Sequence, residues 1–150
     1  MLTSSALQAA TDDLFVVFGA YPFRPHLPAH CDCCPHLDLS GLQSRPLRAQ
    51  SADDLLDAFH LIPSHAGDSR DLRHFLPRFL ELLASGANPS LAPSVLAEHL
   101  LQAQLSSWPR PELLALRQFL HLAPETCPAA QLCDRVLPLL ASSLRTHGGA

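Results

Sequence analysis

An apolar stripe between Asp71 and Gly86 constrains the fold of this 150-residue chain more than any other feature. Its members recur at i, i+3, i+4, i+7, i+8 and i+11, the spacing that places side chains on one face of an α-helix. They are Leu72, Phe75, Leu76, Phe79, Leu80 and Leu83. Gly86 is expected to end the helix, and Pro77 to bend it, because proline removes one backbone hydrogen bond. A stripe this wide cannot be left in water, so we expect it to be buried.

The same period continues along most of the chain. Further helices are predicted over residues 4–18, 51–62, 93–106, 111–122 and 128–145. Ser51 is a good N-cap, and prolines near the starts of the last three helices suit a first helical turn. The sequence therefore predicts an all-α fold, a single compact bundle of about six short helices in one domain, 1–150. The predicted helices from residue 51 onward begin at roughly twenty-residue intervals, which leaves HEAT-like stacking as the alternative.

Residues 19–50 form a long Pro-rich N-terminal connector between the first two helices. They contain five prolines, at positions 22, 25, 28, 35 and 46. Connectors of this length are uncommon in compact domains, so something must order this one. The apolar residues 15–18 are β-prone, but the sequence offers them no partner strand, and we expect no sheet.

The charges exclude several function classes. Ten arginines and no lysine stand against fourteen acidic residues, for a net charge of -4. The arginines are scattered among aspartates and form no basic patch, so no nucleic-acid partner is expected. The absence of lysine excludes phosphate-loop and Schiff-base lysine chemistry. The longest apolar run, residues 14–21, is too short to cross a membrane, and no secretory signal begins the chain, so we expect a cytoplasmic protein without a membrane partner.

Six potential metal ligands lie within eleven residues of the connector. They are His26, His30, Cys31, Cys33, Cys34 and His36. Zinc prefers four tetrahedral thiolate and imidazole ligands, and the two cysteines of Cys31-x-x-Cys34 have a common zinc-ligand spacing. Cys33 or His36 could be the third ligand, and the fourth could be His30 or a distant histidine, of which His74 is the preferred candidate. Bound zinc would order the connector. The predicted ligands are Cys31, Cys33, Cys34, His36 and His74.

Two other interpretations of the cysteines stay open. Five cysteines, three of them within four residues, argue for reduced thiols rather than a disulfide framework, and such thiols could bind nothing. Alternatively, Cys31 and Cys34 could form a redox pair, although no strand–helix–strand pattern surrounds them.

Polar residues also share a face on two predicted helices. Asp53, Asp57 and His60 do so on one helix. His74, Arg78 and Glu81 do so on the next, opposite the apolar stripe. Facing stripes could build an acid–base or metal site, but two solvated faces with charge pairs are the simpler interpretation.

Several segments resemble a family of uncharacterised bacterial proteins. They are Cys31-Asp32-Cys33-Cys34, Arg45-Pro46-Leu47-Arg48, Asp53-Asp54-Leu55, the run from Asp71 to Arg78, and Leu80-Glu81-Leu82. The resemblance covers residues 15–86 and draws attention to the cysteines and His74, but it implies no activity. Members carry Thr-Trp-Gly-Asp where this chain has His65-Ala66-Gly67-Asp68, so no function that uses that tryptophan is expected here.

These observations favour a helical protein-interaction domain with a structural zinc site and another protein as its partner. The alternatives are a metal-dependent enzyme that uses the Cys/His loop and a thiol-based redox sensor. Nothing in the sequence completes a catalytic set, which favours a binding protein over an enzyme. Four protein ligands would indicate structural zinc, whereas three ligands and a water would indicate catalysis.

Overall fold

The helix that carries the apolar stripe, α3 (Ser69–Ser85), runs through the middle of the computed structural model, which describes residues 5–32, 35–86, 88–123 and 128–147. It begins two residues earlier than expected because Asp68 and Asp71 form a capping box, in which each carboxylate accepts the other residue's backbone N–H. Gly86 ends it in the left-handed conformation, with φ of 65°. Every member of the stripe is at most 2% exposed, which confirms that this face is buried.

The described residues contain six α-helices, which confirms the all-α fold. They are α1 (Ser5–Val17), α2 (Leu56–Leu61), α3, α4 (Pro93–Gln102), α5 (Arg110–Leu122) and α6 (Cys133–His147). Four 3-10 helices join them: η1 (Ser40–Leu42), η2 (Leu47–Ala49), η3 (Leu105–Ser107) and η4 (Pro128–Leu132). Two of these, η3 and η4, take up residues that we expected to extend α4 and α6, as 3-10 turns often do at helix ends. No helix in the described part of the chain has both the length and the hydropathy needed to span a bilayer.

Helix α2 is shorter than its sequence predicts. Ser51 Oγ accepts the backbone N–H of Asp54, and Asp54 accepts that of Ser51, so the expected cap is present. Residues 52–55 nevertheless form turns, and the α-helix begins at Leu56.

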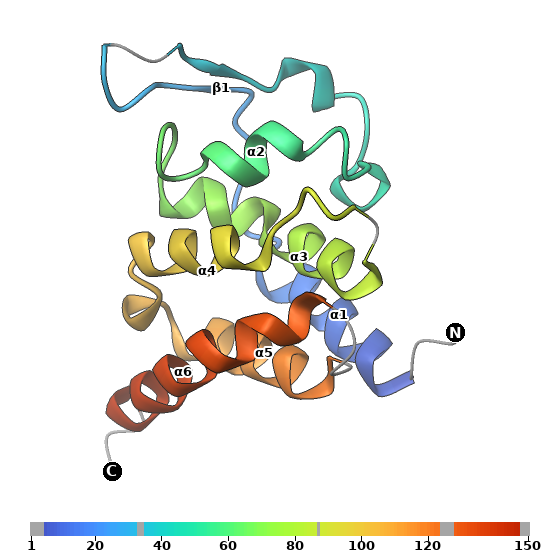
Figure 1. Ribbon diagram of the computed structural model, residues 1–150, viewed down its shortest axis with the longest axis vertical. Coiled ribbons are helices and arrows are strands. Elements are labelled where there is room, and N and C mark those ends of the chain that lie inside the picture. The colour runs from blue at the N-terminus through green and yellow to red at the C-terminus, as the bar shows by residue number, and fades with distance from the viewer. Residues whose placement is uncertain (1–4, 33–34, 87, 124–127, 148–150) are drawn as a thin grey trace.

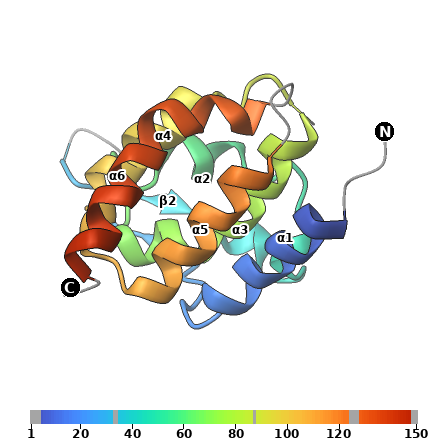
Figure 2. The ribbon, with the colours of Figure 1, turned by 90° about the horizontal axis from the view of Figure 1, so that it is seen from below.

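The helices are stacked along the long axis of the molecule (Figure 1). The part of the connector with strands β1 (His26–Leu27) and β2 (Leu37–Asp38) lies at one end, α2, α3 and α4 follow, and α5 and α6 lie at the other end. Helix α1 packs mainly on α5 and also on α3. Figure 2 shows the molecule from the end at which α5 and α6 lie, with α1 beside α5. The first helix thus packs on a helix that follows it by about a hundred residues, and the helices form a compact bundle, as predicted.

The connector contains a small sheet that the sequence did not predict. Strands β1 (His26–Leu27) and β2 (Leu37–Asp38) pair antiparallel, and Ala29 forms a bridge with Ala66 before α3. A hairpin this short is not stable alone. Leu27 and Leu37 bury their side chains in the core of the domain, so packing on the helices stabilises the pair.

Candidate functional site

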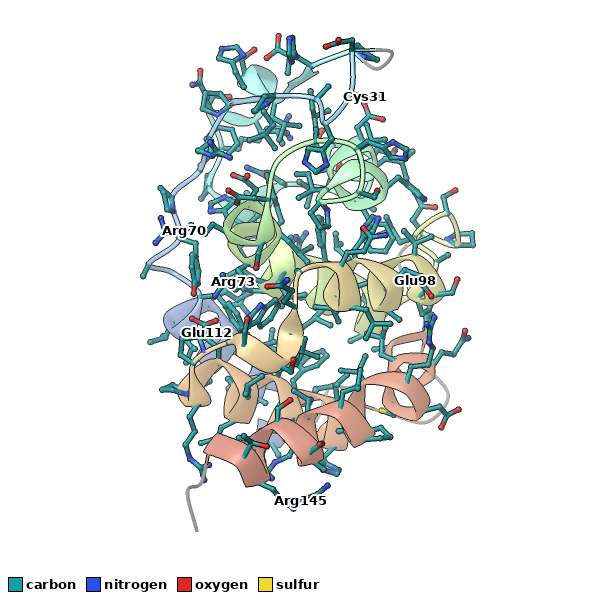
Figure 3. The ribbon with its side chains drawn as sticks, turned by 90° about the vertical axis from the view of Figure 1, so that its left-hand side faces the viewer. Cys31, Arg70, Arg73, Glu98, Glu112 and Arg145 are labelled. Carbon is teal, nitrogen blue, oxygen red and sulfur yellow. The ribbon has the colours of Figure 1, made fainter. Side chains whose placement is uncertain are left out.

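Cys31 lies in the connector between β1 and β2, and Figure 3 shows it at one end of the molecule. Cys31 is exposed, whereas Cys33 and Cys34 lie outside the described residues. His36 is exposed, and its Nδ1 accepts the backbone N–H of Ala29 at 3.0 Å. An accepting nitrogen needs its lone pair, so the proton of the neutral ring is on Nε2. While that bond holds, neither nitrogen of His36 can bind a metal.

Hydrogen bonds hold the base of this loop on the turn between α2 and α3. The backbone N–H of His30 donates to the His65 carbonyl at 2.9 Å. The Nε2 of His30 lies 2.5 Å from the Gly67 carbonyl, to which it can only donate. The Gly67 N–H donates in turn to the Pro28 carbonyl at 3.3 Å. Contacts within the protein thus account for the order of the connector, which was one argument for zinc.

The start of the connector is held by an ion pair with α3. The Arg24 guanidinium binds both carboxylate oxygens of Asp71, at 2.8 and 2.5 Å. Burial would raise the pKa of Asp71, but Arg24 and the Asp68 N–H outweigh it, and the pKa is lowered. Gly67 packs against this carboxylate, since a Cβ there would lie 2.8 Å from Asp71 Oδ2. The positive φ of 71° at Gly67 also favours glycine.

His74 contacts the connector at a different place from the one predicted. Its Nδ1 donates to the Tyr21 carbonyl at 2.9 Å, and its ring packs against Phe23 with centroids 5.7 Å apart. Burial lowers the pKa of His74, and the smaller effect of the Tyr21 carbonyl opposes it. The ring is therefore neutral near pH 7, with its lone pair on Nε2, the form that a metal ligand needs.

The structure does not bring the predicted zinc ligands together within its described part. The contacts of His74 lie at residues 21 and 23, and the preceding residue, Arg73, is well separated from Cys31 along the molecule (Figure 3). No three His, Cys, Asp or Glu side chains among the described residues are grouped so as to hold a metal ion. Because Cys33 and Cys34 are not among these residues, zinc at Cys31, Cys33, Cys34, His36 and His74 stays a prediction.

A buried polar cluster that the sequence did not reveal lies on the face of α3 next to α1 and α5. Arg73 Nη1 donates to Tyr21 Oη at 2.6 Å and to Glu112 Oε1 at 3.2 Å, and the Tyr21 hydroxyl donates to Glu112 Oε2. The Arg73 guanidinium lies 4.6 Å from the centroid of the Tyr21 ring and 5.0 Å from that of Trp108. Burial and, to a smaller extent, the hydrogen bond to Glu112 raise the pKa of Tyr21 to about 12. Arg73 and Glu112 lie near one another in Figure 3, and the cluster joins the start of the connector, at Tyr21, to α3 and α5.

Two further polar side chains of α3, those of Arg78 and Glu81, are largely covered. Arg78 Nε donates to the Gln50 carbonyl at 2.8 Å, and Arg78 Nη1 donates to Glu81 at 2.6 Å. Arg48 of η2 also binds Glu81, at 2.9 Å, and Asp12 of α1, at 2.8 Å. The side chains of Arg78 and Glu81 are 18% and 23% exposed. The prediction that this face is solvated is wrong, because the returning connector packs on it.

An apolar groove opens where α1 ends. The residues that line it are Phe15, Phe18, Gly19, Tyr21, Leu47, His74 and Pro77, and its volume is about 190 Å³. Leu14 and Phe18 are fully buried, whereas Val16, on the opposite side of α1, is 77% exposed. A helix buries only one face, so the longest apolar run of the chain necessarily carries apolar surface into solvent here. That uninterrupted run was the sequence signal for this groove.

Comparisons with family models, curated proteins and solved structures found no match for this chain.

Proposed function

We propose that this protein is a cytoplasmic helical binding module that holds a segment of another protein at the groove beside the end of α1. The exposure of Val16 supports this proposal most directly. Val16 leaves 77% of its surface in water, and the residue before it, Phe15, lines the apolar groove. Exposed apolar surface next to a concave site is typical of protein interaction sites.

The size of the groove favours a single side chain as its occupant. Its volume of about 190 Å³ is below the roughly 300–1,000 Å³ of pockets that hold small molecules and cofactors. Two polar side chains, Tyr21 and His74, line the groove. The Tyr21 hydroxyl is already bonded to Glu112 and Arg73, and Nδ1 of the His74 ring already donates to the Tyr21 carbonyl. The other ring nitrogen accepts a hydrogen bond, so the best match is an apolar side chain with one donor. Tryptophan has this combination, and tyrosine follows it.

A displayed peptide library tests this proposal. Phage peptides selected on the wild-type chain should be enriched in tryptophan or tyrosine, and the chosen peptide should then be measured by calorimetry. Val16→Asp should weaken its binding at least tenfold, because it places a charge on the exposed apolar residue that follows Phe15. Leu101→Asp is the matched control, since Leu101 is 40% exposed on α4 and should bind like wild type. Equal binding to wild type and Val16→Asp, or no selected sequence, would contradict the proposal.

We also propose that a structural zinc ion at the cysteine loop belongs to the same module. Three thiols within four residues of the sequence support this, because thiolates close together in sequence are typical zinc ligands. Since His30 holds the base of the loop, the ion would stiffen the tip alone.

A further inference from the structure

A serine and a buried histidine face one another between the α2–α3 turn and α4. Ser64 Oγ lies 3.1 Å from His99 Nε2. His99 is 4% exposed, whereas Ser64 is half-buried and lines an open hollow of about 440 Å³. This volume is within the roughly 300–1,000 Å³ of small-molecule sites. The pair therefore consists of an accessible hydroxyl and an enclosed imidazole.

The surroundings of His99 favour one arrangement of its proton. Its buried Nδ1 has no hydrogen-bond partner of good geometry among the described residues, and the Phe59 carbonyl is a nearby acceptor. A proton on Nδ1 leaves the lone pair of Nε2 facing the Ser64 hydroxyl. Burial lowers the pKa of His99, with a smaller opposing effect of Phe59, so the ring is neutral near pH 7. A neutral imidazole that accepts from a serine hydroxyl is the arrangement that activates serine.

We propose that Ser64 is a nucleophile toward small esters and that His99 is its general base. Ser64 Oγ forms a bond to the acyl carbon while His99 Nε2 takes the hydroxyl proton. The bond from the acyl carbon to the leaving oxygen then breaks, and His99 returns the proton to the departing alcohol. A water molecule, deprotonated by the same nitrogen, hydrolyses the acyl-serine and restores both residues. Water is the only co-reactant, so atoms and protons balance.

The hollow indicates which esters would enter. Its other lining includes His30, Asp68, Ser69 and Gln102. The Asp68 carboxylate is exposed and disfavours an anionic acyl group, so neutral or cationic esters are expected. No carboxylate binds His99 Nδ1 among the described residues, and a carboxylate normally stabilises the imidazolium. Turnover should therefore be slow, and the acylated serine should accumulate.

Covalent labelling tests the proposal on the full chain. A fluorophosphonate probe should give one adduct, which peptide mapping by mass spectrometry places on Ser64. Ser64→Ala should give none, whereas Ser69→Ala should label like wild type, because Ser69 is in the same hollow but donates to the Ala103 carbonyl. His99→Gln should slow labelling on the order of 100-fold if it removes a general base. Circular dichroism shows whether each variant is folded.

Two results would overturn the proposal. The first is a wild-type chain that acquires no adduct on Ser64, a result that needs no variant. The second is a folded His99→Gln chain that labels as fast as wild type. Either result would show that the hydrogen bond merely holds α4 on the turn before α3. The peptide-binding groove would not be affected, because it shares no lining residue with this hollow.

Discussion

The two faces of α3 are buried by different parts of the chain and through different interactions. The apolar face, with Phe75 and Leu76, packs into the helical core. The polar face, with Arg73, Arg78 and Glu81, binds α5, η2 and the connector through hydrogen bonds and ion pairs. Periodicity shows which residues share a face, but it does not show what covers the polar one. Four changes on α3 test how differently the two faces respond, and the cysteine loop supplies a fifth test.

The largest effect should come from the apolar face. Phe75 is 2% exposed, stacks on Phe79 with centroids 5.7 Å apart and meets Phe23 edge-on. Phe75→Ala should lower the free energy of unfolding by about 3–5 kcal/mol through lost transfer energy and a cavity. Urea unfolding measures this change. Val16→Ala is the control and should change stability by less than about 0.5 kcal/mol, because Val16 is exposed.

Arg73 should come next, although it is on the polar face. Its side chain is 14% exposed and that of Glu112 is 9% exposed, so Arg73→Ala leaves a carboxylate nearly buried without its cation. We expect the free energy of unfolding to fall by about 3 kcal/mol, and urea unfolding measures this change as well. Arg145→Ala, at an exposed position on α6, should be nearly neutral.

A second substitution separates charge burial from packing. If the uncompensated carboxylate causes the loss, Arg73→Ala combined with Glu112→Gln should be more stable than Arg73→Ala alone. A double variant that is less stable would show that Arg73 acts mainly by packing between Tyr21 and Trp108.

The fold was more predictable than the site, for a physical reason. A helix repeats its pattern over many residues, so the members of the apolar stripe between Leu72 and Leu83 were correctly predicted to be buried. The strands of the connector are two residues each, too short for any pattern. The polar cluster joins Tyr21 to Glu112, 91 positions apart, and local spacing carries no information about such a pair. The resemblance pointed to His74, but only the structure shows that Tyr21 is its partner.

Arg78→Ala should lower the free energy of unfolding less than Arg73→Ala does, and more than the replacement of an exposed arginine does. Arg78 hydrogen-bonds to the Gln50 carbonyl and to Glu81, and Glu81 keeps a second partner in Arg48. Partial exposure weakens each interaction, so we expect a loss of about 1–2 kcal/mol in urea unfolding. A loss as large as that of Phe75→Ala would show that the two faces contribute equally. A loss no larger than that of Arg145→Ala would show that the covering connector adds nothing.

The half-buried His74 should make stability depend on pH. Its pKa is lowered from 6.5 in the folded chain, so the unfolded chain binds more protons between the two values. Stability is therefore fully present above pH 6.5 and should fall as the pH decreases through 6.5 toward the folded pKa. The lowered pKa of His99 likewise makes stability fall as the pH decreases. Unfolding midpoints between about pH 7.5 and 5.5 should show a smaller slope in His74→Gln than in wild type. His121→Gln, at an exposed position on α5, is the control.

The smallest effect on stability should come from the cysteine loop. Protein purified without chelators or a metal-affinity tag should carry about one equivalent of zinc, and Cys31→Ser with Cys34→Ser should remove it. Because the His30, Arg24 and Ala29 contacts hold the connector independently, losing the ion should change the free energy of unfolding less than Arg78→Ala does. Wild-type protein without metal would contradict the zinc prediction. A loss as large as that of Arg73→Ala would instead show that the ion joins the hairpin to the helical core, as a ligand as distant as His74 would require.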